Sequence, residues 1–175
     1  MSKTDSKQWF AMRATYGQEV KSQDELSDLS VASFVPMAYK VSTQNGRKTK
    51  ILAPVLNNYI FVNSTAKEIF EAKKEIPCLR YVMNHENDKI IVPTEQMKSF
   101  IQVSSANDKS AIYYLPNEID FKDSPRIRIH GGLLDGVEGR LVKIKGKRNR
   151  RLYVDIENII GLSVIVDPEL IEVLK

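Results

Sequence analysis

Apolar and polar residues alternate with two different periods along the first hundred residues of the chain. Residues 8–16 place apolar side chains on both faces of an extended segment, which predicts a strand covered on both sides. In residues 18–29, apolar side chains recur at helical spacing among charged ones, which predicts an amphipathic helix. The same reasoning predicts further strands over residues 33–42, 51–62 and 79–83, and further helices over residues 66–74 and 94–104. We therefore expect an α+β domain with an antiparallel sheet.

The pattern changes after residue 104. The following segment is polar and rich in turn formers, apart from an apolar island at residues 112–115, and is interpreted as a linker. Beyond it, five short runs are typical of strands (RIRIH, RLVKIK, RLYVDI, GLSVIV and LIEVL), and glycine-containing turns separate them. This pattern favours a small barrel. The predicted organisation is an α+β domain over residues 1–104, a linker over 105–123 and an all-β barrel over 124–175.

Positive charge is concentrated in two clusters. The 175 residues carry a formal net charge of +4, of which +3 falls after residue 123. Residues 143–151 hold six lysines or arginines and no acid, a run that needs solvent or an anionic partner. The second cluster follows Asn45-Gly46, which favours a hairpin turn, and consists of Arg47, Lys48 and Lys50. Either a solvated loop or a nucleic-acid contact accounts for such clusters.

The residue types needed for metal binding and catalysis are scarce. A single cysteine, Cys78, excludes an internal disulfide and a cysteine-based zinc site, and its apolar context is typical of a core residue. The two histidines, His85 and His130, lie in predicted turns. No phosphate-binding glycine loop or nucleophile motif is present. We expect a binding protein with no enzymatic activity, no metal and no cofactor.

No targeting or membrane-spanning segment is apparent. The chain begins with a polar segment, and no apolar run approaches the length of about 18 residues that a membrane-spanning helix requires. Apolar residues make up 42% of the chain and charged residues 27%, a composition typical of globular proteins. We therefore expect a cytoplasmic protein that does not bind membranes.

Two sets of motifs together resemble one known family. GGLLDGVEGRLV, over residues 131–142, resembles the KOW motif, whose turn needs backbone conformations that glycine adopts easily. WFAMRATYGQEVK, FVP, NNYIFV, IP…RYV and IIVPTEQM, in this order over residues 9–97, resemble the N-terminal domain of NusG. The chain is therefore identified as a member of the NusG family of transcription elongation factors. Residues 12–17 and 91–93 are more similar to UpxY-type paralogues, the antiterminators of polysaccharide loci.

This resemblance implies an N-terminal α+β domain that binds the clamp helices of RNA polymerase and raises processivity, followed by an SH3-like KOW barrel. In the family, an aromatic depression meets the tip of a coiled coil. The matching positions here are Tyr16, Tyr59, Phe61, Pro77 and Tyr81. We expect Tyr16 and Tyr59 to form the polymerase-binding patch, because tyrosine combines apolar area with a hydroxyl group. The alternative is that some of these residues face the core, Phe61 above all.

The resemblance also implies a partner-binding loop in the barrel. In NusG the loop between the third and fourth barrel strands recruits Rho or a ribosomal protein. Here it corresponds to residues 158–161, where Ile159 and Ile160 form an apolar pair. Housekeeping NusG has an aromatic residue at the position of Ile160, and Asn57-Asn58 replaces the usual Pro-Gly. Loss of Rho coupling fits a paralogue that opposes Rho.

Both basic clusters are candidate nucleic-acid sites. The first would contact phosphates of nascent RNA or upstream DNA through Lys145, Lys147, Arg148, Arg150 and Arg151. The second would face non-template DNA through Arg47, Lys48 and Lys50. No aromatic residue is interleaved in the first run, so base stacking has little support there.

The favoured function is a monomeric, non-enzymatic transcription elongation and antitermination factor. One alternative is a housekeeping NusG that couples polymerase to Rho or the ribosome. Another is a ribosomal or RNA-binding KOW protein without polymerase contact. The near-neutral N-terminal region argues against the second alternative, because a ribosomal protein would carry more positive charge there.

Overall fold

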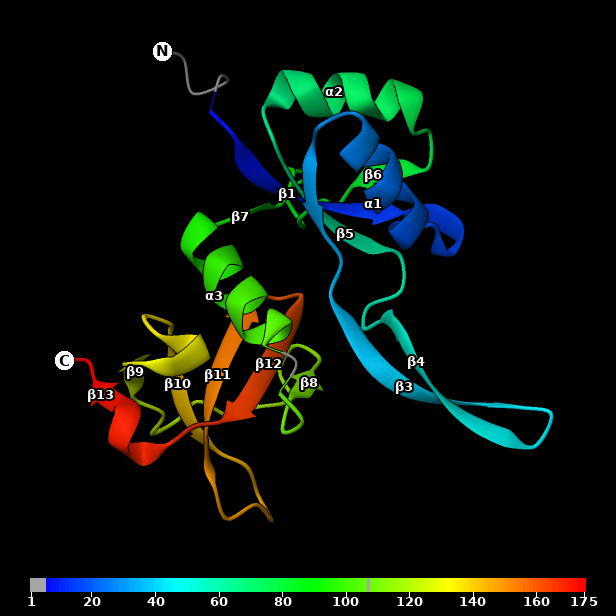
Figure 1. The fold of residues 1–175 in the computed structure, drawn as a ribbon. Coiled ribbons are helices and arrows are strands. Elements are labelled where there is room, and N and C mark those ends of the chain that lie inside the picture. Colours follow the sequence, from blue (N-terminus) through cyan, green and yellow to red (C-terminus); the bar gives the residue numbers. More distant parts are fainter. Residues whose placement is uncertain (1–5, 107) are drawn as a thin grey trace. The chain divides into compact units, whose positions relative to one another are not determined.

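The computed structural model describes residues 6–106 and 108–175 (Figure 1). The chain divides into two compact units between Thr94 and Glu95. The sequence predicts a boundary near residue 104. The structure therefore groups the helix α3 (Thr94–Ser105) and the segment expected to be a linker with the second unit.

The first unit contains a five-stranded antiparallel sheet with the order β2-β5-β1-β6, in which β7 also pairs with β1. The first unit as a whole contains seven strands in its described residues: β1 (Gln8–Ala14), β2 (Ala32–Phe34), β3 (Met37–Gln44), β4 (Arg47–Pro54), β5 (Tyr59–Ser64), β6 (Leu79–Tyr81) and β7 (Ile91–Val92). Its helices are α1 (Glu19–Asp28) and α2 (Ala66–Glu75). The predicted α+β architecture with an antiparallel sheet is confirmed.

Two predicted strands each divide in two. The segment over residues 33–42 breaks between β2 and β3, where Pro36 has no N–H group to donate to a neighbouring strand. The segment over residues 51–62 breaks between β4 and β5. The Val55 N–H donates to the Pro36 carbonyl oxygen at 2.8 Å, so the two breaks face each other and allow β3 and β4 to leave the sheet as a hairpin.

The core of the first unit lies between one face of the sheet and the two helices. Alternate residues of β1 (Phe10, Met12 and Ala14) enter this core, and Leu26 of α1 and Ile69 of α2 meet them there. Burying each of the larger side chains among them contributes about 1.5–3 kcal/mol. The sequence predicts which side chains face this core, because apolar residues alternate without interruption along the strands and recur at helical spacing along the helices.

The β3–β4 hairpin forms a two-stranded sheet of its own (Figure 1). Its register runs from Met37 opposite Pro54 to Gln44 opposite Arg47. Asn45 and Gly46 occupy the turn with φ values of 50° and 74°. The predicted tight turn is therefore confirmed.

The second unit contains α3 and a six-stranded antiparallel sheet with the order β13-β9-β10-β11-β12-β8. The strands are β8 (Ile112–Tyr114), β9 (Arg126–Ile129), β10 (Glu138–Lys143), β11 (Arg150–Ile156), β12 (Ile160–Ile165) and β13 (Ile171–Val173). Two 3₁₀ turns, η2 (Gly132–Leu134) and η3 (Pro168–Leu170), connect them. All five strands expected after residue 124 are present. The apolar island adds the sixth strand, β8, beside β12.

Helix α3 packs on this second sheet. The Phe100 and Tyr113 rings lie 6.5 Å apart, and the Ser104 and Tyr113 hydroxyls lie within hydrogen-bond distance at 3.1 Å. Gln102 Nε2 donates to the carbonyl oxygens of Leu133 at 3.0 Å and Asp135 at 3.1 Å. These contacts explain why the boundary between the two units precedes most of α3. The sequence shows the apolar stripe of this helix but does not show which surface the stripe covers.

Candidate functional site

Tyr16 lies in a strained turn at the end of β1. Its backbone φ is 61°, in the left-handed region that bulky residues rarely adopt, and its side chain is 92% exposed. Asn58 holds this turn through two hydrogen bonds. Its carbonyl oxygen accepts from the Ala14 N–H at 2.8 Å, and its Oδ1 accepts from the Gly17 N–H at 2.8 Å. The turn therefore presents an exposed aromatic side chain at the expense of local strain.

Tyr59 follows Asn58 directly and pairs with Arg13 across β5 and β1. The Arg13 guanidinium lies 5.2 Å from the centroid of the Tyr59 ring, and its Nη2 donates to the Tyr59 hydroxyl at 3.4 Å. On the other side of β1, Arg13 is opposite Arg80 of β6. Two like charges in a directly opposed pair are unfavourable, so this face of the sheet favours an anionic or electron-rich partner.

Pro77 joins this surface through the turn that follows α2. The Thr15 N–H donates to the Cys78 carbonyl oxygen at 3.2 Å, which connects the Tyr16 turn to the Pro77-Cys78 turn. Pro77 is exposed, and its carbonyl oxygen accepts from Arg80 Nη1 at 2.8 Å. We call the resulting surface the tyrosine patch; it consists of Arg13, Tyr16, Tyr59, Pro77 and Arg80.

The other two predicted polymerase-binding residues lie outside the tyrosine patch. Phe61 is 0% exposed and pairs with Ala11 and Phe34 within the sheet, so it belongs to the interior, as the alternative interpretation has it. Tyr81 pairs with Met12, whereas Tyr59 pairs with the next residue, Arg13. Because successive residues of a strand point to opposite faces, Tyr81 and Tyr59 lie on opposite faces of the sheet.

Tyr81 lies between two lysines. The Nζ atoms of Lys73, on α2, and of Lys89 each lie 4.2 Å from the centroid of its ring. Partial burial raises the pKa of the Tyr81 hydroxyl. Burial, and then the nearby charges of Arg80 and Lys89, lower the pKa of Lys73. The lysines therefore hold the ring by cation–π contacts and restrict its availability to a partner.

The predicted basic residues of the β3–β4 hairpin are all exposed. Lys48 is opposite Thr43 and Lys50 is opposite Val41, whereas Arg47 is opposite Gln44 on the other face. None of the three forms an ion pair within residues 6–106 and 108–175. Their charge is therefore available to an anionic partner.

The basic run between β10 and β11 divides into exposed and buried members. Lys145, Lys147, Arg148 and Arg150 are exposed. Arg151 is only 3% exposed: its Nε donates to the Ser163 hydroxyl at 2.8 Å, and its Nη2 donates to the carbonyl oxygens of Ser163 and Ser110. The assignment of Arg151 to nucleic acid is therefore wrong. It connects the segment before β8 to β12.

The predicted partner-binding pair, Ile159 and Ile160, is buried. Ile160 alternates with Leu162 and Val164 toward the core of the sheet, a pattern already present in the sequence. The exposed residues of this loop are Glu157 and Asn158. The loop therefore offers polar groups beside a cleft of about 400 Å³ rather than an apolar contact surface.

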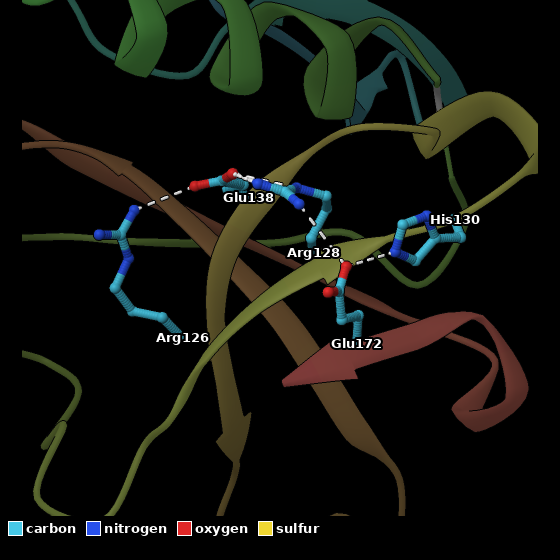
Figure 2. Close-up of polar contacts among 5 residues, drawn as sticks. All are labelled: Arg126, Arg128, His130, Glu138 and Glu172. Atoms are coloured by element: carbon cyan, nitrogen blue, oxygen red, sulfur yellow. Dashed lines mark hydrogen bonds and ion pairs between the residues drawn. The ribbon is translucent and has the colours of Figure 1, made fainter. Parts of the chain in front are cut away.

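A network of charged residues covers part of the second sheet (Figure 2). It comprises Arg126, Arg128 and His130 of β9 and its end, Glu138 of β10 and Glu172 of β13. Glu138 binds Arg128 at 2.6 Å and Arg126 at 3.1 Å, and Glu172 lies 2.6 Å from His130 Nε2. The network joins the terminal strand to its neighbours. The network also neutralises the basic residues of β9. In the described part of the chain, the basic residues of the exposed loop between β10 and β11 are not neutralised in this way.

The described residues offer little for catalysis or metal binding. Among them, no group of three or more histidine, cysteine, aspartate or glutamate side chains is arranged to hold a metal ion. The Cys78 Sγ lies 3.2 Å from the Ser22 hydroxyl in a partly buried position, consistent with the expected packing role. None of the described helices is long and apolar enough to cross a membrane.

Comparison with known proteins identifies the family of the first unit. The family model described as NusG, transcription termination factor, matches residues 7–101, more than half of the chain. Thermotoga maritima NusG, in a structure of its domain interaction, is 16% identical with a TM-score of 0.49, over 97% of this chain and 98% of that one. The MjSpt4:Spt5 complex, conformation B, gives 15% identity and a TM-score of 0.28, over 95% and 96%. A search of curated proteins found no match.

Proposed function

Because the chain belongs to the NusG family, we propose that this transcription factor binds RNA polymerase through its tyrosine patch and acts in elongation and antitermination. The observation that carries the proposal is the exposed, strained Tyr16, whose turn is hydrogen-bonded to Asn58, the residue directly before Tyr59. Strained residues persist where the surrounding structure holds them and are frequent at functional sites. Tyrosine is also enriched at the centres of protein interfaces. The clamp helices are the part of polymerase that this surface would contact.

Replacing both tyrosines tests the polymerase contact. The Tyr16→Ala/Tyr59→Ala variant should capture at least tenfold less core polymerase in a pull-down, because the two rings supply most of the exposed aromatic area of the patch. Phe70→Ala is the matched control, since it removes an exposed aromatic ring from α2 of the same unit. A folded double variant that captures as much polymerase as the Phe70→Ala control would remove the tyrosines from the site.

We also propose that the second unit is a KOW barrel of a specialised paralogue that acts on particular operons, such as those for polysaccharides. The five strands after residue 124 and the glycine turns before β10 support the barrel. The burial of Ile159 and Ile160 supports a paralogue that lacks the usual Rho contact, because the loop exposes no apolar pair.

A termination assay separates this paralogue from a housekeeping factor. In transcription with purified polymerase, the chain should reduce termination both with and without Rho. Enhanced Rho-dependent termination would instead support the housekeeping alternative. During this transcription reaction, the exposed basic residues are proposed to contact phosphates of the nascent RNA; they are Lys145, Lys147, Arg148 and Arg150.

A further inference from the structure

Arg13 and Arg80 form an arginine pair within the tyrosine patch. The two residues are directly opposite each other on β1 and β6, and both are exposed. Within residues 6–106 and 108–175, neither of them forms an ion pair. Like charges in a directly opposed pair repel each other. The arginine pair therefore keeps two positive charges that the described part of the chain does not neutralise.

Neutral groups of the patch position each guanidinium. Arg13 lies over the Tyr59 ring, 5.2 Å from its centroid, and donates to the Tyr59 hydroxyl from Nη2. Arg80 donates from Nη1 to the carbonyl oxygens of Pro77 at 2.8 Å and Leu79 at 3.2 Å. A guanidinium carries five N–H donors in a planar fork, and these contacts use one nitrogen of each group. They hold the two groups in place without cancelling their charge.

The second unit shows how this chain neutralises arginines on a sheet (Figure 2). Glu138 binds Arg128 at 2.6 Å and Arg126 at 3.1 Å, so one carboxylate serves two guanidinium groups. The arginine pair of the first unit has the same two cations and lacks such a carboxylate among the described residues. Guanidinium groups bind carboxylates through parallel, charge-assisted hydrogen bonds. A carboxylate from a partner would therefore complete the arginine pair.

The surroundings of the arginine pair suit a protein better than a nucleic-acid backbone. The next residues on this face, Ala11 of β1 and Phe61 of β5, are opposite each other and buried. Lys73 and Lys89 lie against the Tyr81 ring, on the other face of the sheet. The pair is therefore bordered by apolar and aromatic groups, whereas successive phosphates need a row of cations. Arginine and tyrosine are also enriched where protein interfaces bind most strongly.

We propose that the tyrosine patch binds a protein segment that places a carboxylate, from an aspartate or a glutamate, between Arg13 and Arg80. This inference rests on the proposed function, in which polymerase occupies the patch, and names the chemical group that polymerase brings to it. The carboxylate relieves the repulsion between the two cations, so it is bound in preference to a neutral group. The tyrosines supply contact area, and the arginine pair distinguishes partners by charge.

Capture of purified core polymerase, after nuclease treatment, tests the arginine pair. Arg13→Gln/Arg80→Gln should weaken capture by about tenfold or more, because the partner carboxylate loses both of its cations. Lys7→Gln/Lys67→Gln is the matched control, since it changes the net charge equally at exposed residues beyond the other end of β1 and β5. This control should bind within about twofold of the parent chain. Equal capture by the two double variants would overturn the proposal.

A charge-retaining variant separates partner binding from support of the patch. Arg13→Lys/Arg80→Lys keeps both charges but loses the guanidinium contacts to Tyr59 and Pro77. It should capture polymerase at least about threefold better than Arg13→Gln/Arg80→Gln does, because its amines still attract the carboxylate. If the arginines only support the patch, both variants lose the same contacts and capture falls equally. That result would overturn the proposal.

Carbodiimide coupling identifies the partner group directly. This reagent joins an amine to a carboxylate as an amide and leaves arginine unmodified. Arg13→Lys/Arg80→Lys introduces amines at the pair, so mass spectrometry of its complex should show a cross-link from residue 13 or 80 to an aspartate or glutamate of polymerase. The parent chain should give no cross-link at these positions. Cross-links from other lysines alone would overturn the proposal.

The outcomes distinguish this inference from the proposed function. Capture lost by Tyr16→Ala/Tyr59→Ala and retained by Arg13→Gln/Arg80→Gln overturns the carboxylate contact and keeps the polymerase contact. Capture retained by both variants overturns the inference and the proposed function together. A loss by Arg13→Gln/Arg80→Gln that occurs only without nuclease treatment assigns the pair to phosphates of a nucleic acid, which also overturns the inference.

Discussion

The two basic hairpins of the molecule differ in what covers them. The β3–β4 hairpin has no third strand, and both of its faces are largely exposed. The β10–β11 hairpin belongs to a six-stranded sheet, and residues 110–121 cover the face of β11 that carries Arg151 and Tyr153. Basic residues that look equivalent in the sequence therefore have different roles. Lys50 remains exposed beside a tyrosine, whereas Arg151 holds the sheet together.

This comparison shows that the density of basic residues does not by itself identify a nucleic-acid site. Arg150 and Arg151 are neighbours, but alternation along the strand directs them to opposite faces. Arg150 remains exposed, whereas Arg151 finds a hydroxyl and two carbonyl oxygens as acceptors. A buried cation with such partners contributes to stability rather than to binding.

The largest expected effect concerns one glycine in each hairpin. A Cβ at Gly139 of β10 would lie 2.3 Å from the Tyr153 carbonyl oxygen and 2.8 Å from Leu152 Cδ1, whereas a Cβ at Gly46 would meet nothing within 4 Å. Gly139→Ala should lower the free energy of unfolding by about 3 kcal/mol or more, since backbone must shift. Gly46→Ala should cost about 1 kcal/mol, from its positive φ alone.

Chemical denaturation followed by circular dichroism measures both glycine variants. Equal losses for Gly139→Ala and Gly46→Ala would show that the two hairpins are packed equally closely. A larger loss for Gly139→Ala supports a closely packed β10–β11 pair and an open β3–β4 pair.

The next effect concerns Arg151. Arg151→Ala should lower the free energy of unfolding by about 2–3 kcal/mol, because Ser110 and Ser163 lose a charged donor in a buried position. Arg150→Ala is the matched control and should change it by less than about 0.5 kcal/mol, as exposed substitutions do. Unfolding in urea gives both values. An Arg151→Ala variant as stable as the control would return Arg151 to the candidate nucleic-acid site.

A smaller effect shows whether the exposed basic residues of the β10–β11 loop contact RNA. Replacing Lys145, Lys147 and Arg148 with alanine should make RNA binding less dependent on salt, by about 2 in the slope of log affinity against log salt, if each contacts one phosphate. The measurement is anisotropy with a labelled oligo-U at several salt concentrations. An unchanged slope would mean that the loop is only solvated, and the β3–β4 hairpin would be the remaining basic site.

The sequence predicts the elements better than it predicts what covers them. The alternation in β1 and β11 and the Asn45-Gly46 turn identify strands and a hairpin, because these features depend on neighbouring residues. The apolar residues at 160, 162 and 164 also show that Ile160 faces the core, although the resemblance to a partner-binding loop directs attention elsewhere. The pairing of β8 with β12 depends on distant segments, so the segment appears as a linker in the sequence.

The same limit applies to the candidate site. The resemblance singles out Tyr16 and Tyr59 as a binding pair, and the departure at Asn57-Asn58 marks a change in the family pattern; the structure leaves Tyr16 exposed and Tyr59 half-buried. The role of Asn58 requires the fold, because its side chain reaches Gly17, which is 41 residues earlier in the chain. Asparagine suits this position because it tolerates a positive φ, here 67°, and carries a hydrogen-bond acceptor.

The smallest effect compares the tyrosines of the two hairpins. Burial, assisted by the charge of Asp155, raises the pKa of Tyr153 to about 12, and the Phe121 ring lies 4.9 Å from its own. Since the folded pKa exceeds the ordinary value of 10.0, Tyr153 stabilises the fold below pH 10, and this contribution is lost as the pH rises from 10 to 12. Between pH 9 and pH 11 the parent chain should therefore lose about 1 kcal/mol more stability than Tyr153→Phe, measured by urea unfolding. Tyr39→Phe, which alters an exposed ring, should lose stability as the parent chain does. If Tyr39→Phe and Tyr153→Phe instead lose the same amount, the face of β11 beneath residues 110–121 is as open to water as the β3–β4 hairpin.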